Sequence, residues 1–245
     1  MSNRTQYEND LAALKTALTE MGQSAADAVE AAMEALCTAD AEAAAAVVQG
    51  DGRINNMERD IEHRCMTLLL RQQPVAGDLR RISTTMKVVT DVERIGDHAT
   101  NIAGYARTMM ERRLELSSQA SVELADMRTS CMRAVHLICS ACCVDFTFAP
   151  EQESPDKRGS LTEHDAPAEH ISLPQHASLL EQALLLEQDI DSRTARYRSN
   201  QIERMRKGKC HVETSILYSE ILTDYERIGD HAFNIAQALD KLDEN

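Results

Sequence analysis

The sequence predicts an all-α protein made of two tandem three-helix bundles that are related by an internal repeat. Apolar residues recur at alternating spacings of three and four, as in amphipathic helices, and no stretch shows the sustained alternation of a strand. Aromatic residues make up only 3% of the 245 residues and Trp is absent, which is typical of helical bundles. The segment DVERIGDHATNIA at 91–103 returns at 224–236 as DYERIGDHAFNIA, so one unit occurs twice.

The first bundle is predicted to span 1–115, with helices over about 5–38, from there to about 71, and over about 75–112. The core-facing stripe of the first helix begins with Leu11, Leu14, Leu18 and Met21. Residues 38–40 are a plausible break before the second helix. Gly50 and Gly52 leave open a kink in that helix or a later start, and Pro74 marks the turn to the third.

The second bundle is predicted to span 116–245 on the same plan, with helices over about 118–147, about 175–206 and about 210–243. The turn before its last helix is predicted at Lys207, Gly208 and Lys209. Residues 149–176 hold four of the five prolines among polar residues, and we expect a mobile Pro-rich loop there. Its histidines are expected to belong to a solvated linker rather than to a metal site: His164, His170 and His176.

The charge and the cysteines exclude several classes of protein. A formal net charge of −14 argues against nucleic acid as a partner and permits metal ions or a basic protein surface. Because there is no signal-peptide pattern and no long apolar run, we expect a cytoplasmic protein without a membrane span. The seven cysteines, including the C-x-x-C-C pattern at 139–143, are expected to be reduced, small core residues rather than a redox or metal motif.

The repeated segment predicts a helix with an acidic face. Glu93, Asp97 and Asn101 are spaced one turn apart and therefore line one side, with an apolar stripe roughly opposite. The second copy places its own residues in the same way: Glu226, Asp230 and Asn234. A glycine inside each copy, Gly96 or Gly229, indicates close approach of a neighbouring helix or of whatever the acids hold.

Two carboxylates one turn apart repel each other, and a cation bound between them would make their arrangement favourable. Oxygen ligands suit magnesium, calcium and manganese, and carboxylates also bind iron and zinc. The second helix of each half offers a further pair that could face these acids, Asp51 with Asn55 and Glu187 with Asp191. Glu58 lies on the same side as Asp51, but its counterpart in the second half is Thr194. The alternative is that the acids form an ordinary solvated helix face.

The repeated Glu-Arg-Ile-Gly-Asp-His followed by Asn-Ile-Ala resembles the PhoU family of phosphate-transport accessory and signalling regulators. Pro74, Asp78, Leu79 and Arg80 are similar to that family's start of the third helix. The resemblance covers nearly the whole chain except 149–176. It implies two three-helix bundles with a pseudo-twofold relation and no catalysis.

The resemblance also implies metal ions at the Glu/Asp-x-x-x-Asp pairs, with iron or zinc favoured and manganese or magnesium as alternatives. It implies an adaptor between the phosphate ABC transporter, through its ATPase, and a sensor histidine kinase, which negatively regulates the phosphate-starvation response. A homodimer stays open. Two other hypotheses compete with this one: a carboxylate-bridged di-metal oxidase, although no His follows a Glu by three residues, and a purely structural bundle.

Overall fold

A computed structural model describes the chain except for residues 1–2, 72–73, 75, 145–176 and 244–245. Its described part is six helices with no strand, as the sequence predicts. The helices are α1 (Asn3–Thr38), α2 (Ala41–Arg71), α3 (Ala76–Glu111), α4 (Ser118–Val144), α5 (Leu179–Arg206) and α6 (Val212–Asp243). The predicted Pro-rich loop at 149–176 and its three histidines lie outside the described residues.

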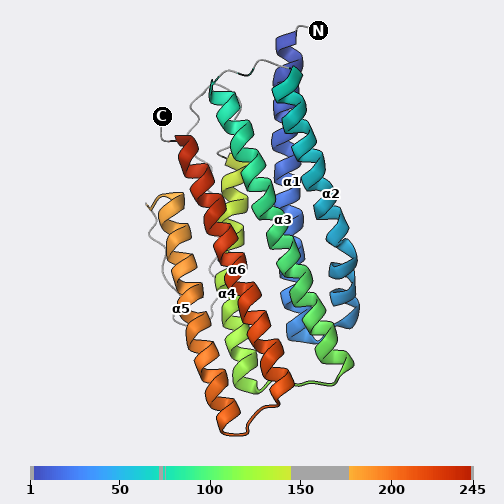
Figure 1. The fold of residues 1–245 in the computed structure, drawn as a ribbon, viewed down its shortest axis with the longest axis vertical. Helices are drawn as coiled ribbons and strands as arrows, with labels where there is room; N and C mark the ends of the chain where they lie inside the picture. Colours follow the sequence, from blue (N-terminus) through green and yellow to red (C-terminus); the bar gives the residue numbers. More distant parts are fainter. Residues whose placement is uncertain (1–2, 72–73, 75, 145–176, 244–245) are drawn as a thin grey trace.

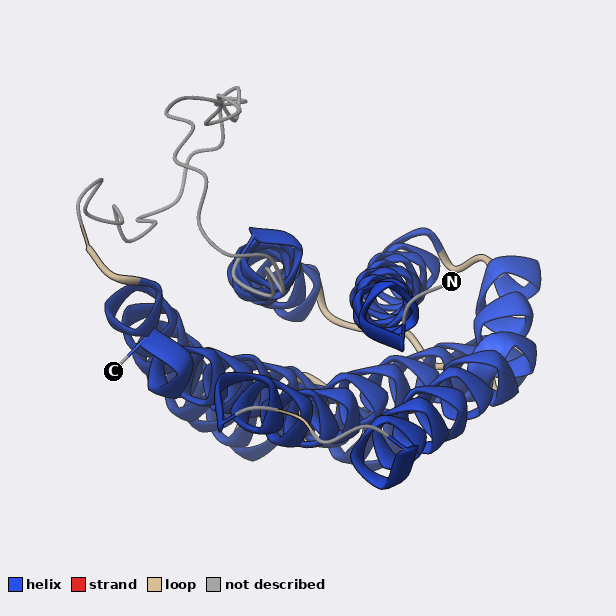
Figure 2. Ribbon diagram, turned by 90° about the horizontal axis from the view of Figure 1, so that it is seen from above, coloured by secondary structure: helices blue, strands red, loops and turns tan. Residues whose placement is uncertain are grey.

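The six helices form two units of three, in which each helix packs against the other two. Two further contacts join the units: α3 lies against α6, and α1 lies against α4. Figure 1 shows α3 and α6 side by side and running in opposite directions. Viewed from above, α5, α6, α3 and α2 form one curved layer, and α1 and α4 lie on its concave side (Figure 2). The molecule is therefore a tandem repeat whose two third helices meet at its centre.

The helix ends have local causes. Ala39 adopts a φ of 54° at the predicted break, and the Asp40 carboxylate then accepts hydrogen bonds of 3.0 Å from two backbone amides of the first turn of α2. α2 continues through Gly50 and Gly52, so the alternative of a later start is wrong. α5 begins a few residues later than predicted because Ser178 and Glu181 form a reciprocal capping box there.

The predicted apolar stripes form one core. Leu11, Leu14, Leu18 and Met21 of α1 are all at most 2% exposed. The core-facing side chains of α4 are buried as well, and Cys131 is one of them. Among the described cysteines no disulfide is present, and the interior thiols pack as small apolar side chains.

Tyr225 is one of the two substitutions between the repeated segments and lies wholly in this core. Its hydroxyl is buried without a hydrogen-bond partner among the described residues. A buried hydroxyl that lacks a partner costs about 1–3 kcal/mol. We therefore expect Tyr225→Phe to raise the free energy of unfolding by about 1–2 kcal/mol in urea denaturation, a gain within that penalty.

The matched control for this prediction is Tyr218→Phe. Tyr218 is equally buried, but its hydroxyl donates to the Glu123 carboxylate, so the same change should destabilise the protein. Equal effects of the two substitutions would contradict the assignment.

Candidate metal centres on the two acidic helix faces

Each acidic face lies beside a close contact between two helices. A Cβ added to Gly96 on α3 would lie 2.9 Å from Cδ1 of Ile54 on α2, and one added to Gly229 on α6 would lie 2.9 Å from Cδ1 of Ile190 on α5. Real Cβ atoms essentially never approach so closely, so a larger residue at either position would force the isoleucine side chain to shift. The two contacts correspond in the repeat, and therefore the residues around Ile54 and Ile190 occupy equivalent places.

In the second half, three of the predicted acids converge. Glu187 and Asp191 on α5 and Asp230 on α6 each place an oxygen within 4.8 Å of the others. Burial raises the pKa of Glu187, and the charges of Asp191 and Asp230 raise it further. Burial likewise raises the pKa of Asp191, and the charges of Glu226 and Asp230 add to that increase. The α5 pair therefore faces the α6 pair, as the sequence predicts.

Glu226, the fourth predicted acid of this site, forms a salt bridge with an arginine. Arg198 on α5 places Nη2 2.9 Å from Oε2 of Glu226. Arg227 contacts Asp230 at 3.0 Å and is well exposed. Because these pairs are open to solvent, they only partly offset the mutual repulsion of the acids.

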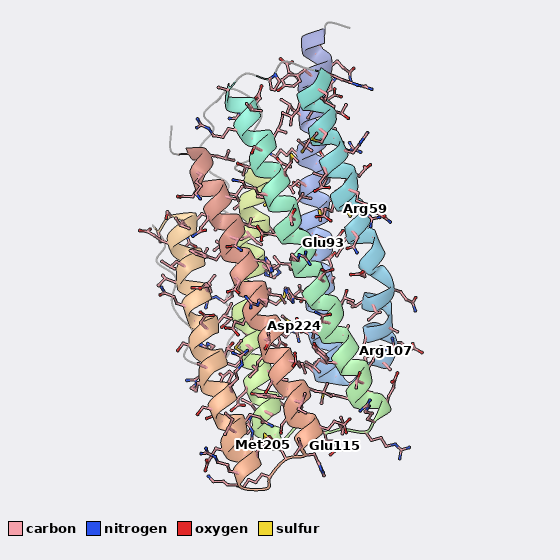
Figure 3. The ribbon with its side chains drawn as sticks, in the orientation of Figure 1. Arg59, Glu93, Arg107, Glu115, Met205 and Asp224 are labelled. Carbon is pink, nitrogen blue, oxygen red and sulfur yellow. The ribbon has the colours of Figure 1, made fainter. Side chains whose placement is uncertain are left out.

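In the first half, the acids also gather between α2 and α3. Burial raises the pKa of Glu93, and the charges of Asp97 and Glu58 raise it further, while Arg94 opposes them. Burial also raises the pKa of Glu58, with added increases from nearby acids that include Asp97. The site therefore contains Glu58 beside the predicted acids. Figure 3 shows Glu93 near the middle of the long α3 helix.

The first site differs from the second at the residues on α2. Asn55 donates from Nδ2 to Asp51 at 3.3 Å, and its Oδ1 is buried without a hydrogen-bond partner among the described residues. Thr100 donates to the other oxygen of Asp51 at 3.1 Å. The equivalent of Thr100 is Phe233, which has no hydroxyl to donate. The substitution Thr100/Phe233 therefore leaves Glu187, the equivalent of Asp51, without such a donor.

The pKa of Glu187 and that of Asp191 are raised in the folded protein. These carboxyl groups therefore contribute stability below their unfolded pKa of about 4. That contribution is lost as the pH rises through their folded pKa. For metal-free protein we expect Glu187→Gln to raise the free energy of unfolding at neutral pH by about 0.2–0.5 kcal/mol per relieved like-charge pair. The difference should shrink as the pH falls toward the unfolded pKa, as measured by urea denaturation. Glu203→Gln is the control, because Glu203 is exposed and paired with Lys207. Stability that falls in Glu187→Gln would contradict the expectation.

The centre of the repeat holds a second arrangement that the sequence analysis missed. His98 Nδ1 on α3 lies 2.6 Å from Oδ1 of Asp224 on α6, and His231 Nδ1 on α6 lies 2.8 Å from Oδ1 of Asp91 on α3. The two imidazole rings stack on each other with centroids 5.5 Å apart. Asn101 adds a 3.2 Å hydrogen bond to Asp224. The first Asp of each motif copy thus contacts the His of the other copy, as a pseudo-twofold relation requires.

A signal for this contact was present in the sequence. Asp91 and Asp224 open the two copies of the motif and are identical, and each stands seven residues before its motif His, on the same helix face. A search for carboxylates one turn apart does not reveal this contact, because the face that carries Asp91 and His98 pairs with its own copy on the other helix.

Comparison with protein-family models matches residues 18–106 and 172–239 to the PhoU domain. A protein of Thermotoga maritima named phosphate-specific transport system accessory protein PhoU homolog 1 is 27% identical over 237 residues, covering 97% of this chain and 88% of that protein. A Clostridium acetobutylicum protein named phosphate-specific transport system accessory protein PhoU homolog is 44% identical over 98 residues. That match covers 40% of this chain and 45% of the relative, less than half of each.

Solved structures agree in fold. The crystal structure of PhoU from Pseudomonas aeruginosa has a TM-score of 0.79 at 26% identity and covers 96% of this chain and 98% of that one. A phosphate transport system regulatory protein PhoU from Streptococcus pneumoniae has a TM-score of 0.74 at 22% identity, with 97% of each chain covered. None of the described helices is long and apolar enough to cross a membrane. The doubled motif, the two three-helix units and the family match agree, and the chain belongs to the PhoU family.

Proposed function

We propose that this protein is a metal-binding regulator of phosphate uptake and signalling in the cytoplasm. It acts as an adaptor between the phosphate ABC transporter and a sensor histidine kinase, and it negatively regulates the phosphate-starvation response. The names of its relatives support the link to phosphate transport. The metal-binding part of the proposal depends on the acidic faces.

The observation that carries metal binding is the convergence of Glu187, Asp191 and Asp230. Three carboxylate oxygens within 4.8 Å of one another, with the pKa of two of the groups raised, form a set that repels itself when empty. A hard cation bound to such oxygens would cancel that repulsion and hold α5 against α6. Iron or zinc is expected from the family, and manganese or magnesium would suit the same oxygens.

The first half offers a related set, in which Asn55 replaces one carboxylate and Glu58 adds one where the second half has Thr194. Glu93 and Asp97 would supply carboxylates from α3, and Asp51 would supply one from α2. The orphaned Oδ1 of Asn55 is a neutral oxygen of the kind that cations accept as a ligand. Because three carboxylate oxygens converge within 4.8 Å among the described residues only at Glu187, Asp191 and Asp230, we expect the first site to bind metal more weakly than the second.

Metal content tests this part of the proposal. Protein purified without chelator or affinity tag is compared by mass spectrometry with a variant that carries Glu93→Ala, Asp97→Ala, Glu226→Ala and Asp230→Ala. We expect stoichiometric metal in the wild type and its loss in the variant. A control with the same change of charge at exposed acids should keep the metal: Glu42→Ala, Asp60→Ala, Glu111→Ala and Glu203→Ala. Wild-type protein that is metal-free and binds none on titration would overturn metal binding.

Regulation is tested separately in the cell. Deletion of the gene should raise phosphatase expression in phosphate-rich medium, and restoring the wild-type gene should lower it again. Unchanged expression after deletion would contradict the regulatory role. Restoring the four-residue variant instead shows whether regulation needs the acidic faces, independently of whether the protein regulates at all.

A further inference from the structure

A groove of about 910 Å³ lies between the beginning of α3 and the end of α6, and none of the carboxylates proposed as metal ligands lines it. These two helix ends are neighbours at the top of Figure 1. Three basic side chains line the groove: Arg80, Lys87 and Lys241. Between them lie hydrogen-bonding groups such as Ser83 and Gln237, and the apolar side chain of Leu79, which is 49% exposed.

The three basic residues stand in a chain that is acidic as a whole. Asp and Glu outnumber Lys and Arg by 40 to 26, and most arginines of the described helices contact an acid. By contrast, Arg80, Lys87 and Lys241 are exposed and form no salt bridge with any described residue. Asp91 is the one acid among the described lining residues, and its carboxylate is occupied by His231. With three cations and one carboxylate, the described lining of the groove carries a net positive charge.

The internal repeat shows that the equivalent positions at the other end of these two helices do not carry the same charges. The register that aligns Asp91 with Asp224 also aligns Arg80 with Glu213 and Lys87 with Glu220. Lys241 is likewise aligned with the neutral Thr108. Arg80 and Lys87 thus have acidic equivalents and Lys241 has a neutral one, although the central motif is nearly identical in the two copies.

We infer that this groove binds an acidic segment of a partner protein. Arg80 and Lys87 stand two helical turns apart on one face of α3, about 10 Å along the axis, and Lys241 faces them from α6. Carboxylates spaced along a peptide could pair with these cations. An apolar side chain of the same peptide would cover Leu79. The length of the groove and its apolar wall favour a peptide over a single small anion.

Selection of peptides against the wild-type protein tests the inference. A displayed random-peptide library is selected on the full chain and counter-selected on a variant carrying Arg80→Glu, Lys87→Glu and Lys241→Glu. We expect the recovered sequences to be rich in Asp and Glu with at least one aliphatic residue. This outcome is demanding, because the net charge of −14 repels acidic peptides from the rest of the surface. Recovered sequences without an acidic excess would overturn the inference.

Affinity measurements on a recovered peptide complete the test. Fluorescence anisotropy should show a loss of at least about tenfold in the charge-reversed variant and weaker binding at higher salt. A matched control reverses three exposed cations in the turns at the other end of the molecule and should bind within about twofold of wild type: Arg113→Glu, Arg206→Glu and Lys209→Glu. Equal losses in both variants would mean that net charge, not the groove, decides binding.

Two further arms identify other occupants. Saturable binding of inorganic phosphate that displaces the peptide would make the groove an oxyanion site. Sedimentation that shows a dimer in the wild type and a monomer in the charge-reversed variant would make the occupant a second copy of this chain. Either result overturns the inference. Repeating the selection on the variant without the four acidic-face carboxylates keeps its outcome separate from that of metal binding.

Discussion

Arg204→Met should lower the free energy of unfolding by about 3–5 kcal/mol, because it removes one partner of a buried ion pair. Glu123 is 2% exposed, and Arg204 contacts both of its carboxylate oxygens, at 3.0 and 2.7 Å. Asn200 and Tyr218 also donate to this carboxylate, but neither carries the compensating charge. Thermal unfolding should shift down by about 6–20 °C, from about 2–4 °C per kcal/mol in a chain of this size.

The pH dependence gives this prediction a second readout. Burial opposes ionisation of Glu123, but the hydrogen bonds from Arg204, Tyr218 and Asn200 outweigh it and lower the pKa of this carboxyl group. A lowered pKa means stability that is present above the unfolded pKa and is lost as the pH falls through the folded pKa. The Arg204→Met variant should lose part of that acid sensitivity.

Arg206→Met is the control for this substitution. Arg206 lies two residues further along α5, is exposed, and forms no salt bridge with a described residue. Its replacement should change the free energy of unfolding by less than about 0.5 kcal/mol. If the two variants were equally stable, the hydrogen-bond network of Glu123 would not contribute to the free energy of unfolding.

Asp224→Ala should destabilise the protein by about 2–3 kcal/mol, because it removes a buried acceptor from the contact between the two halves. Its side chain is 7% exposed and holds both His98 and Asn101. The repeat supplies a matched comparison in Asp91→Ala. Asp91 is 22% exposed and its bond to Asn234 is long, at 3.5 Å, so we expect a loss of only about 1 kcal/mol.

A double-mutant cycle isolates the contact itself. Asp224→Ala is combined with His98→Ala, and the free energy of unfolding is measured in urea for the four proteins. We expect a coupling of about 1 kcal/mol or more, which is typical of residues that share a hydrogen bond. Additive losses would show that the carboxylate stabilises α6 without acting through His98.

The sequence predicts well those features that depend on the spacing of residues along one helix. The stripe that begins with Leu11 and Leu14 repeats every turn, so burial follows from spacing alone. The facing of Glu187 and Asp191 toward Asp230 was also predictable, because Ile190 stands beside the pair and Gly229 marks where another helix comes close. Both inferences need only helical geometry and neighbouring helices.

Contacts between the halves were beyond that reasoning. The pairing of α3 with α6 brings Asp91 to His231 across the chain, and no local period states which exposed faces will meet. Within the second half, the salt bridge of Arg198 with Glu226 depends on the distance between α5 and α6, which the spacing along one helix does not give.

The reciprocal contact of α3 with α6 has a consequence for the origin of the chain. In a symmetric homodimer, residue i of one subunit meets residue j of the other, and j meets i in return. The pairs Asp91–His231 and Asp224–His98 satisfy this rule within one polypeptide. A lone three-helix ancestor could therefore have dimerised through this same face before duplication and fusion. Only after fusion could one end acquire Arg80 and the other Glu213, because subunits of a homodimer share one sequence.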